Sequence, residues 1–188
     1  MGQPGQKVGM KLTGPQIIGE LRDKLQFEIG RHLYGVLGAY AQLARFEEHD
    51  LAQARDPQGR PFPQPINLNR ELLARIDDAS LRQMVQDEAR RPSSVQRRLN
   101  HELDGLLSGQ LENSHLLILK QFELIFAYEL DLSIFRTRAT NQNHVVLLLP
   151  GERRSEHVTL FHEAEPRFHR AFPGNIIADN HLWELVDA

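Results

Sequence analysis

The segment from Leu160 to Phe172 holds the densest group of side chains that could bind a metal or transfer a proton. Its candidate ligands are His162, Glu163, Glu165 and His169. A metal site needs three or four such ligands that converge on one point, and each histidine is normally oriented by a further hydrogen bond. The spacing differs from the HExxH motif, in which two histidines lie one helical turn apart with a glutamate between them. One interpretation of this segment is a histidine- and glutamate-based metal-dependent hydrolase.

A structural interpretation explains the same segment without a metal. Strand-like residues 156–162 would end in a turn, and Pro166 would begin a short helix. Glu165 would then lie at the helix N-terminus, where a carboxylate is favourable. Three phenylalanines would anchor the segment in the core: Phe161, Phe168 and Phe172. We favour this interpretation and expect neither a metal nor another cofactor.

A second group of side chains could bind phosphate. Four arginines flank a helix start at residues 92–94, and two more lie at the tip of an expected hairpin; they are Arg90, Arg91, Arg97, Arg98, Arg153 and Arg154. Guanidinium groups and helix N-termini are both good phosphate contacts. Three carboxylates, Asp87, Glu88 and Glu102, are interleaved with the first four arginines. These arginines could therefore form ion pairs instead, either within the chain or with a protein partner.

Several sequence signatures of enzymes are missing. The chain has no glycine-rich phosphate loop, no GxSxG motif, no EF-hand and no paired-carboxylate motif. Cysteine is absent, which excludes disulfides, thiolate catalysis, cysteine-ligated zinc and iron–sulfur clusters. These absences favour a non-enzymatic role.

A helical pattern runs through the first quarter of the chain. Residues 13–15 (Thr-Gly-Pro) are typical of a helix start, and apolar residues then recur at steps of three or four up to Leu43. A helix from Pro15 to about Ala54 would be roughly 60 Å long, which exceeds the diameter of a small domain. We expect it to kink at one or more of three glycines, Gly30, Gly35 and Gly38. We also expect its apolar stripe to bind another protein or a second copy of the chain; the stripe includes Ile18, Leu21, Leu25, Leu33, Val36 and Tyr40.

The remaining pattern predicts an α+β fold. A proline-rich loop at 55–67 precedes helical patterns at 67–85 and from Ser93 to about Gly109, so residues 13–109 form a helical hairpin or small bundle with a long first helix. Apolar residues alternate from Phe122 to Ile134, which indicates a strand that bends or follows a helical portion. Further strands are expected at 144–149 and 156–163. Residues 110–188 would thus form a C-terminal antiparallel β-meander that shares one core with the helices.

Composition limits the compartment and the partners. The formal net charge of −3 gives no global attraction to nucleic acid or acidic membranes, so binding to either would need a local patch. The most apolar stretch, 116–132, is interrupted by charged side chains and cannot span a bilayer. Residues 1–12 are expected to be a disordered lead-in without the pattern of a signal peptide. We expect a cytoplasmic protein that does not contact membranes.

The functional expectation is a non-enzymatic protein-interaction subunit or adaptor of a multiprotein assembly. This expectation depends on the apolar stripe, which is too long for the core available to cover it. The alternative is an accessory protein that binds nucleic acid or phosphate through the arginines, and a second alternative is the metal-dependent hydrolase.

Overall fold

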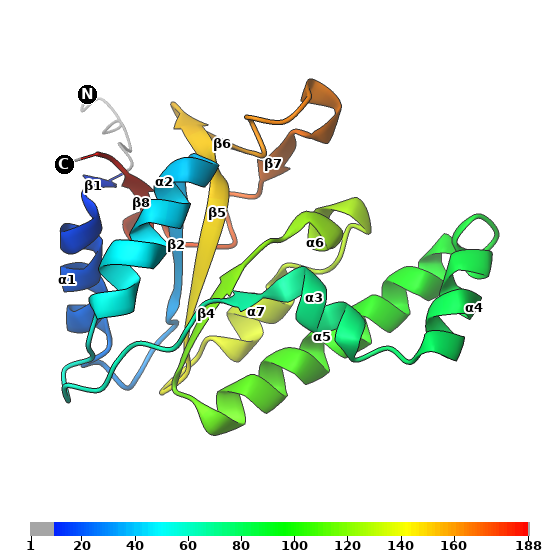
Figure 1. Ribbon diagram of the computed structural model, residues 1–188, viewed down its shortest axis with the longest axis horizontal. Helices are drawn as coiled ribbons and strands as arrows, with labels where there is room; N and C mark the ends of the chain where they lie inside the picture. The colour runs from blue at the N-terminus through cyan, green and yellow to red at the C-terminus, as the bar shows by residue number, and fades with distance from the viewer. Residues whose placement is uncertain (1–9, 188) are drawn as a thin grey trace, which may run out of the picture.

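The computed structural model describes residues 10–187, which form a largely parallel β-sheet with helices on both faces (Figure 1). Six strands lie in the order β1-β8-β2-β5-β4-β3, each parallel to its neighbour. Their bounds are Met10–Leu12 (β1), Leu33–Gly38 (β2), Ile66–Asn67 (β3), Leu116–Lys120 (β4), His144–Arg154 (β5) and Leu182–Leu185 (β8). The end of β5 continues into an antiparallel ribbon with β6 (His157–Leu160) and β7 (Arg170–Phe172). The fold is therefore α/β.

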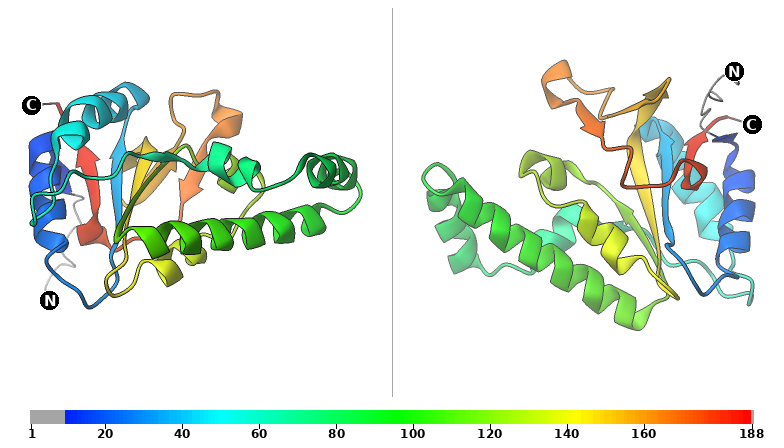
Figure 2. Two further views of the ribbon diagram at one scale, coloured as in Figure 1. Left: turned by 60° about the horizontal axis from the view of Figure 1, so that its bottom comes forward. Right: turned by 180° about the vertical axis from the view of Figure 1, so that it is seen from behind.

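The helices form a layer on each face of the sheet (Figures 1 and 2). One face is covered by α1 (Gly14–Lys24) and by α2 (Tyr40–Arg45), which continues into a π-helix at Phe46–Leu51. The other face is covered by α3 (Leu68–Ala74), α5 (Pro92–Asn113), α6 (Glu123–Ala127) and α7 (Ser133–Arg138). Helix α4 (Asp78–Glu88) packs on α5 at the far end of the molecule, and two 3₁₀ turns lie at Pro166–Phe168 and Asp179–His181. Among the described residues, no helix is both long and apolar enough to cross a membrane.

The central strand β2 shows why this sheet needs apolar residues on both faces. All six of its residues are buried, because helices cover the sheet above and below. Leu33 and Leu37 belong to the core under α5, while Tyr34 and Val36 belong to the core under α1. Gly35 lies between them, where a Cβ would be only 2.6 Å from Leu182 Cδ1 and 2.9 Å from Ile177 Cδ1.

The prediction of one long first helix is wrong. The stretch forms a helix, a turn, a strand and a second helix, and Ile29 in the middle of the expected stripe is 88% exposed. Gly30 has φ +134°, which turns the chain into β2. A strand buried on both faces has no alternation, so its apolar residues also matched helical spacing. The helix start at Thr13 is confirmed, since Thr13 N donates to Gln16 Oε1 at 2.9 Å. Of the expected lead-in, residues 1–9 lie outside the described residues and Met10–Leu12 form β1.

The expected C-terminal antiparallel meander is also wrong as a description of the sheet. Only β5, β6 and β7 pair in that way, whereas β4, β5 and β8 are parallel members of the main sheet. The alternating stretch from Phe122 to Ile134 forms α6 and the start of α7 instead of a strand. Its even-numbered apolar residues include half-buried ones that cover the core from outside, such as Phe126 and Tyr128. Parallel pairing depends on crossover connections, which local alternation does not reveal.

The segment from Leu160 to Phe172 folds partly as expected. Strand β6, a turn and the 3₁₀ turn that begins at Pro166 follow one another in the predicted order. Phe161 and Phe172 are buried, at 5% and 6% exposure. Phe168 is 48% exposed, so its prediction as a core anchor is wrong. Its ring instead lies under the guanidinium of Arg167, at 4.7 Å from the ring centroid.

Candidate functional site

The connections that leave β2 and β5 turn to opposite faces of the sheet. After β2 the chain enters α2 and the π-helix, where Phe46 and Leu51 pack on the α1 side. After β5 it enters the ribbon, where Leu160 and Phe172 pack on the α5 side. In open parallel sheets, ligands bind in the crevice that such diverging connections leave at the carboxyl ends of the strands. A cavity of about 260 Å³ lies at this place.

The lining of this carboxyl-end cavity comes from segments far apart in the sequence. Gly38 and Ala39 form one wall at the end of β2. The polar side chains around it come from β1, α2, β5, β8 and the turn after β6; they are Lys11, Gln42, Glu152, Arg153, His162 and Glu184. The sheet order places β1, β8, β2 and β5 side by side, which brings these residues together.

Arg153 is the most unusual of these side chains, because it is buried without a hydrogen bond. Its side chain is 8% exposed, and no described residue accepts a hydrogen bond from its buried Nε. The nearest carboxylate oxygen is Glu184 Oε1 at 3.8 Å, beyond hydrogen-bond distance. Burial of a guanidinium without short hydrogen bonds is unfavourable. Arg153 therefore has free capacity to bind an anion.

The turn after β6 brings a carboxylate to the end of β2. Phe161 has φ +59°, and its backbone N–H donates to the Pro150 carbonyl at 2.7 Å. Two residues later, Glu163 Oε2 accepts a hydrogen bond from the Tyr40 backbone N–H at 2.7 Å. The neighbouring His162 faces the cavity, and its buried Nδ1 has no hydrogen-bond partner among the described residues. The protein thus places one of its own anions beside the Arg153 cavity.

The Tyr40 side chain lies among carboxylates on the outer side of this region. Its hydroxyl donates to Glu123 Oε1 at 3.5 Å, and Asn69 Nδ2 donates to the other oxygen of Glu123 at 2.6 Å. Burial raises the pKa of the Tyr40 hydroxyl, and the carboxylates of Glu123 and Glu163 raise it further. Negative charge therefore gathers around Tyr40, whereas the cavity lining combines the basic Lys11 and Arg153 with the carboxylates of Glu152 and Glu184.

The predicted metal quartet does not converge. Glu163 bonds Tyr40, Glu165 pairs with Arg167 at 3.0 Å, and His169 Nε2 lies 3.0 Å from the Ala164 carbonyl oxygen. Within residues 10–187, no group of three or more histidines, cysteines, aspartates or glutamates is placed to hold a metal ion. Of the quartet, only His162 lines the carboxyl-end cavity.

The six predicted arginines do not form one patch. Arg153 lies in the carboxyl-end cavity, while its neighbour Arg154 is 82% exposed and pairs with Glu152 at 2.8 Å. The other four lie near the junction of α4 and α5, at the opposite end of the molecule (Figure 1). There Arg98 pairs with Glu102 at 3.0 Å, and Arg97 Nε donates to the Ser93 carbonyl at 3.3 Å. Arg90 and Arg91 follow α4, just before α5.

The residues of the predicted interaction stripe lie mainly in the core. Leu21, Leu33 and Val36 are at most 4% exposed, and Ile18 and Leu25 pack against the core under α1. Tyr40 begins α2 and is 44% exposed. The stripe is therefore no surface on which a partner could bind, and glutamate at Leu33 or Val36 would disrupt the sheet itself.

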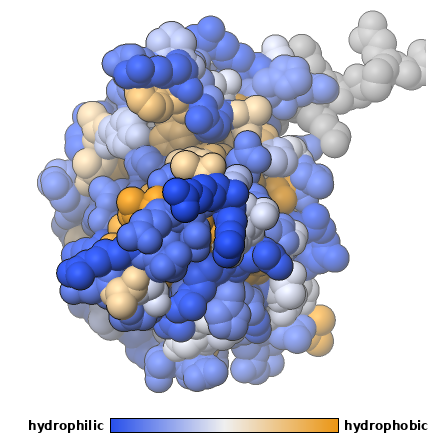
Figure 3. Space-filling model, turned by 90° about the vertical axis from the view of Figure 1, so that its right-hand side faces the viewer, coloured by the Kyte–Doolittle hydropathy of each residue, from blue (hydrophilic) through white to orange (hydrophobic). Residues whose placement is uncertain are grey.

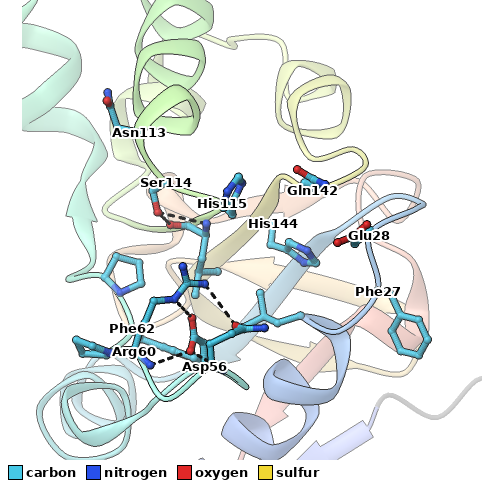
Figure 4. A pocket seen from close by; sticks show the side chains of 15 residues that line it. Phe27, Glu28, Asp56, Arg60, Phe62, Asn113, Ser114, His115, Gln142 and His144 are labelled. Carbon is cyan, nitrogen blue, oxygen red and sulfur yellow. Dashed lines mark hydrogen bonds and ion pairs between the residues drawn. The ribbon is translucent and has the colours of Figure 1, made fainter.

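A larger cavity of about 590 Å³ lies at the amino ends of β4 and β5 (Figure 4). His144, the first residue of β5, lines it and is 3% exposed. Its ring stacks on that of His32 with 4.1 Å between centroids, and His32 Nδ1 lies 3.0 Å from the Tyr34 hydroxyl. Burial lowers the pKa of His144 to about 4, with smaller contributions from His32 and His115. His144 is therefore uncharged at neutral pH.

No protein-family model matches the chain, and neither a curated protein nor a solved structure is significantly similar to it. Only the geometry of the cavities therefore bears on what the protein does. Arg153 and His162 belong to groups that the sequence singles out, whereas Lys11, Gln42 and Glu184 lie in no local motif. One sequence signal could have indicated this cavity. The apolar run of β2 ends in Gly38 and leads into a helix, which is typical of a strand–turn–helix unit at a ligand site.

Proposed function

We propose that this protein binds a small ligand through a phosphate or carboxylate group at the carboxyl ends of β2, β5 and β8. The observation that carries the proposal is Arg153, a buried guanidinium that faces a cavity and lacks a short hydrogen bond. Arginine binds phosphate and carboxylate oxygens in a bidentate manner, and such charged hydrogen bonds are stronger than neutral ones. A cytoplasmic location belongs to the same proposal, and the absence of cysteine supports it.

The size and chemistry of the cavity support binding rather than catalysis. A volume of about 260 Å³ is at or below the lower end of the range for small-molecule sites, so it suits an anionic group with few further atoms. The chain from Gly38 to Gln42 reads Gly-Ala-Tyr-Ala-Gln. It lacks the lysine and the serine or threonine that a nucleotide-hydrolysing phosphate loop supplies.

Calorimetry with inorganic phosphate and with citrate tests this proposal. Arg153→Gln removes the buried charge, whereas Arg154→Gln is a matched control at the exposed neighbouring position. We expect the Arg153 variant to bind about 10- to 100-fold more weakly than the unmodified protein, since a charged hydrogen bond contributes about 1.5–3 kcal/mol. The Arg154 variant should bind normally. Absence of binding to both anions, or equal affinity in the Arg153 variant, would contradict the proposal.

Association with another protein is a second candidate function, and α4 is the observation that favours it. None of its 11 residues is buried. Leu81 is 36% exposed and Val85 is 65% exposed, and Leu73 at the end of α3 adds a third exposed apolar side chain. Figure 3 views the molecule from this end, where small apolar areas lie among hydrophilic ones. The interaction surface would thus be α4 and not the N-terminal stripe.

Light scattering after size-exclusion chromatography tests self-association through α4. We expect an oligomer for the unmodified protein and a monomer of unchanged helical content for the double variant Leu81→Glu/Val85→Glu. Both positions are exposed, so the substitutions leave the core intact. A monomeric unmodified protein would exclude self-association through this helix.

A further inference from the structure

The cavity at the amino ends of β4 and β5 has the properties of a second and separate ligand site. Along β5, His144 lies at this end and Arg153 lies at the other. Nine residues at roughly 3.3 Å each separate them by roughly 30 Å. One small ligand therefore cannot occupy both cavities, and the amino-end cavity needs its own explanation.

The walls of this cavity combine flat apolar surfaces with hydrogen-bonding groups. Its volume of about 590 Å³ lies within the usual range for small-molecule sites. Phe62 forms a buried wall, and Phe27 at the rim is 62% exposed, so its ring is available for stacking. Figure 4 shows His115, Gln142 and Glu28 around the opening, above His144.

His144 supplies the evidence that a partner is missing from this cavity. It is 3% exposed, and its buried Nδ1 has no hydrogen-bond partner among residues 10–187. Behind it, the buried Nε2 of His32 likewise lacks a partner in the described chain. Buried polar atoms are almost always hydrogen-bonded in folded proteins, so each exception requires an explanation. Because His144 Nδ1 is itself buried, the ring must turn toward the cavity for a ligand there to bond to it, and that bond would satisfy one of these atoms.

The charge of the lining disfavours an anionic ligand. Among the described residues, Arg60 is the only arginine or lysine in the lining, and it is already engaged. Its Nε donates to Asp56 Oδ2 at 2.7 Å, and its backbone N–H donates to the other carboxylate oxygen at 2.9 Å. Glu28 forms no ion pair within the described chain and adds a negative charge at the rim. His144 is uncharged at neutral pH, as described above.

We propose that this cavity binds an uncharged planar nitrogen heterocycle of the purine base or nucleoside class. A purine presents a flat face that can stack on Phe27. Its edge carries both N–H donors and ring-nitrogen acceptors. The amide of Gln142 can bond to either kind of group, Glu28 can accept from an N–H, and His144 Nδ1 can donate or accept according to its tautomer.

Equilibrium dialysis of the full chain with adenosine and with guanosine at pH 7 tests this site. Two variants change exposed rim positions that carry no core packing, Phe27→Ala and Gln142→Ala. A third, His144→Phe, keeps a ring against His32 but removes the hydrogen bond. We expect saturable binding of at least one nucleoside, with affinity at least ten-fold lower in each of the three variants. Arg153→Gln is the control, and it should bind the nucleoside normally because its cavity lies at the other end of β5.

Three outcomes would overturn the proposal. The first is the absence of saturable binding of either nucleoside by the unmodified protein. The second is unchanged affinity in both rim variants. The third is loss of binding in the Arg153→Gln variant alone, which would place the nucleoside at the carboxyl-end cavity. The carboxyl-end cavity is tested separately, by calorimetry with phosphate and citrate. A failure of nucleoside binding would therefore not contradict the function proposed for that cavity.

Discussion

Acid should destabilise this protein through the buried histidine pair, and His144→Phe should remove a large part of that sensitivity. The two rings stack at 4.1 Å and are 3% and 5% exposed, so a positive charge on either ring would be largely removed from water. Burial lowers the pKa of His144 to about 4 from the ordinary value of 6.5. Burial also lowers the pKa of His32, and the Lys24 charge adds to that effect.

The direction of the effect follows from which state binds the proton. Between pH 6.5 and about pH 4, the unfolded chain protonates His144 and the folded chain does not. Stability is therefore complete above pH 6.5 and is lost as the pH falls through this window. With these two pKa values, His144 alone lowers the free energy of unfolding by about 2 kcal/mol at pH 5 and by about 3 kcal/mol at pH 4. Such a loss is a large fraction of the stability of a domain.

Urea denaturation at pH 7 and at pH 5 measures this effect. The unmodified protein should lose at least about 2 kcal/mol between the two pH values, and His144→Phe should lose about 2 kcal/mol less than that. Phenylalanine keeps a ring in the stack but cannot bind a proton. The same substitution at His157, which is exposed on β6, is the control and should leave the pH dependence unchanged. An equal loss of stability in the His144 variant and the unmodified protein would refute the reasoning.

Three further predictions use matched changes elsewhere. Glu163→Gln removes the protein's own anion beside the carboxyl-end cavity, so calorimetry should show several-fold tighter phosphate binding; weaker binding would contradict this. Phe172→Ala should lower the free energy of unfolding by about 3–5 kcal/mol in urea titrations, whereas Phe168→Ala, at a half-exposed ring, should lower it by less than about 1 kcal/mol. Gly35→Ala should destabilise the sheet by about 1–3 kcal/mol, while Gly109→Ala, with open space around it on α5, should not destabilise the protein.

Local signals in the sequence predicted the elements better than their arrangement. The helix start at Thr13, the strand that begins at His144 and the turn at Pro166 each depend on a few neighbouring residues. The long helix failed because Leu33 and Val36 fit a helical spacing as well as a strand buried on both faces. Only the pairing of β2 with β5 and β8, residues more than 100 positions away, decides between these alternatives.

The carboxyl-end cavity could not be assembled from sequence for the same reason. The sequence predicted Arg153 as part of an exposed basic hairpin tip, and it predicted His162 as a metal ligand. Lys11 and Glu184 come from opposite ends of the chain, and the parallel pairing of β1 with β8 places them side by side. A site formed by strand order has no spacing that local patterns can detect.

Arg153 lacks a short hydrogen bond although carboxylates lie nearby, because two of the three are bound to other groups and the third, Glu184, lies between Arg153 and Lys11. Glu152, its neighbour in the chain, pairs with Arg154 at 2.8 Å. Glu163 accepts the Tyr40 backbone N–H, and Glu184 lies 3.8 Å from both Arg153 and Lys11, too far for a hydrogen bond to either. A purely structural arginine would normally form a short bond to one of these oxygens, since a buried guanidinium is stabilised by short charged hydrogen bonds as well as by the long ion pair with Glu184. Three carboxylates thus surround the region while the guanidinium stays open toward the cavity, which is the arrangement expected when its anion comes from a ligand.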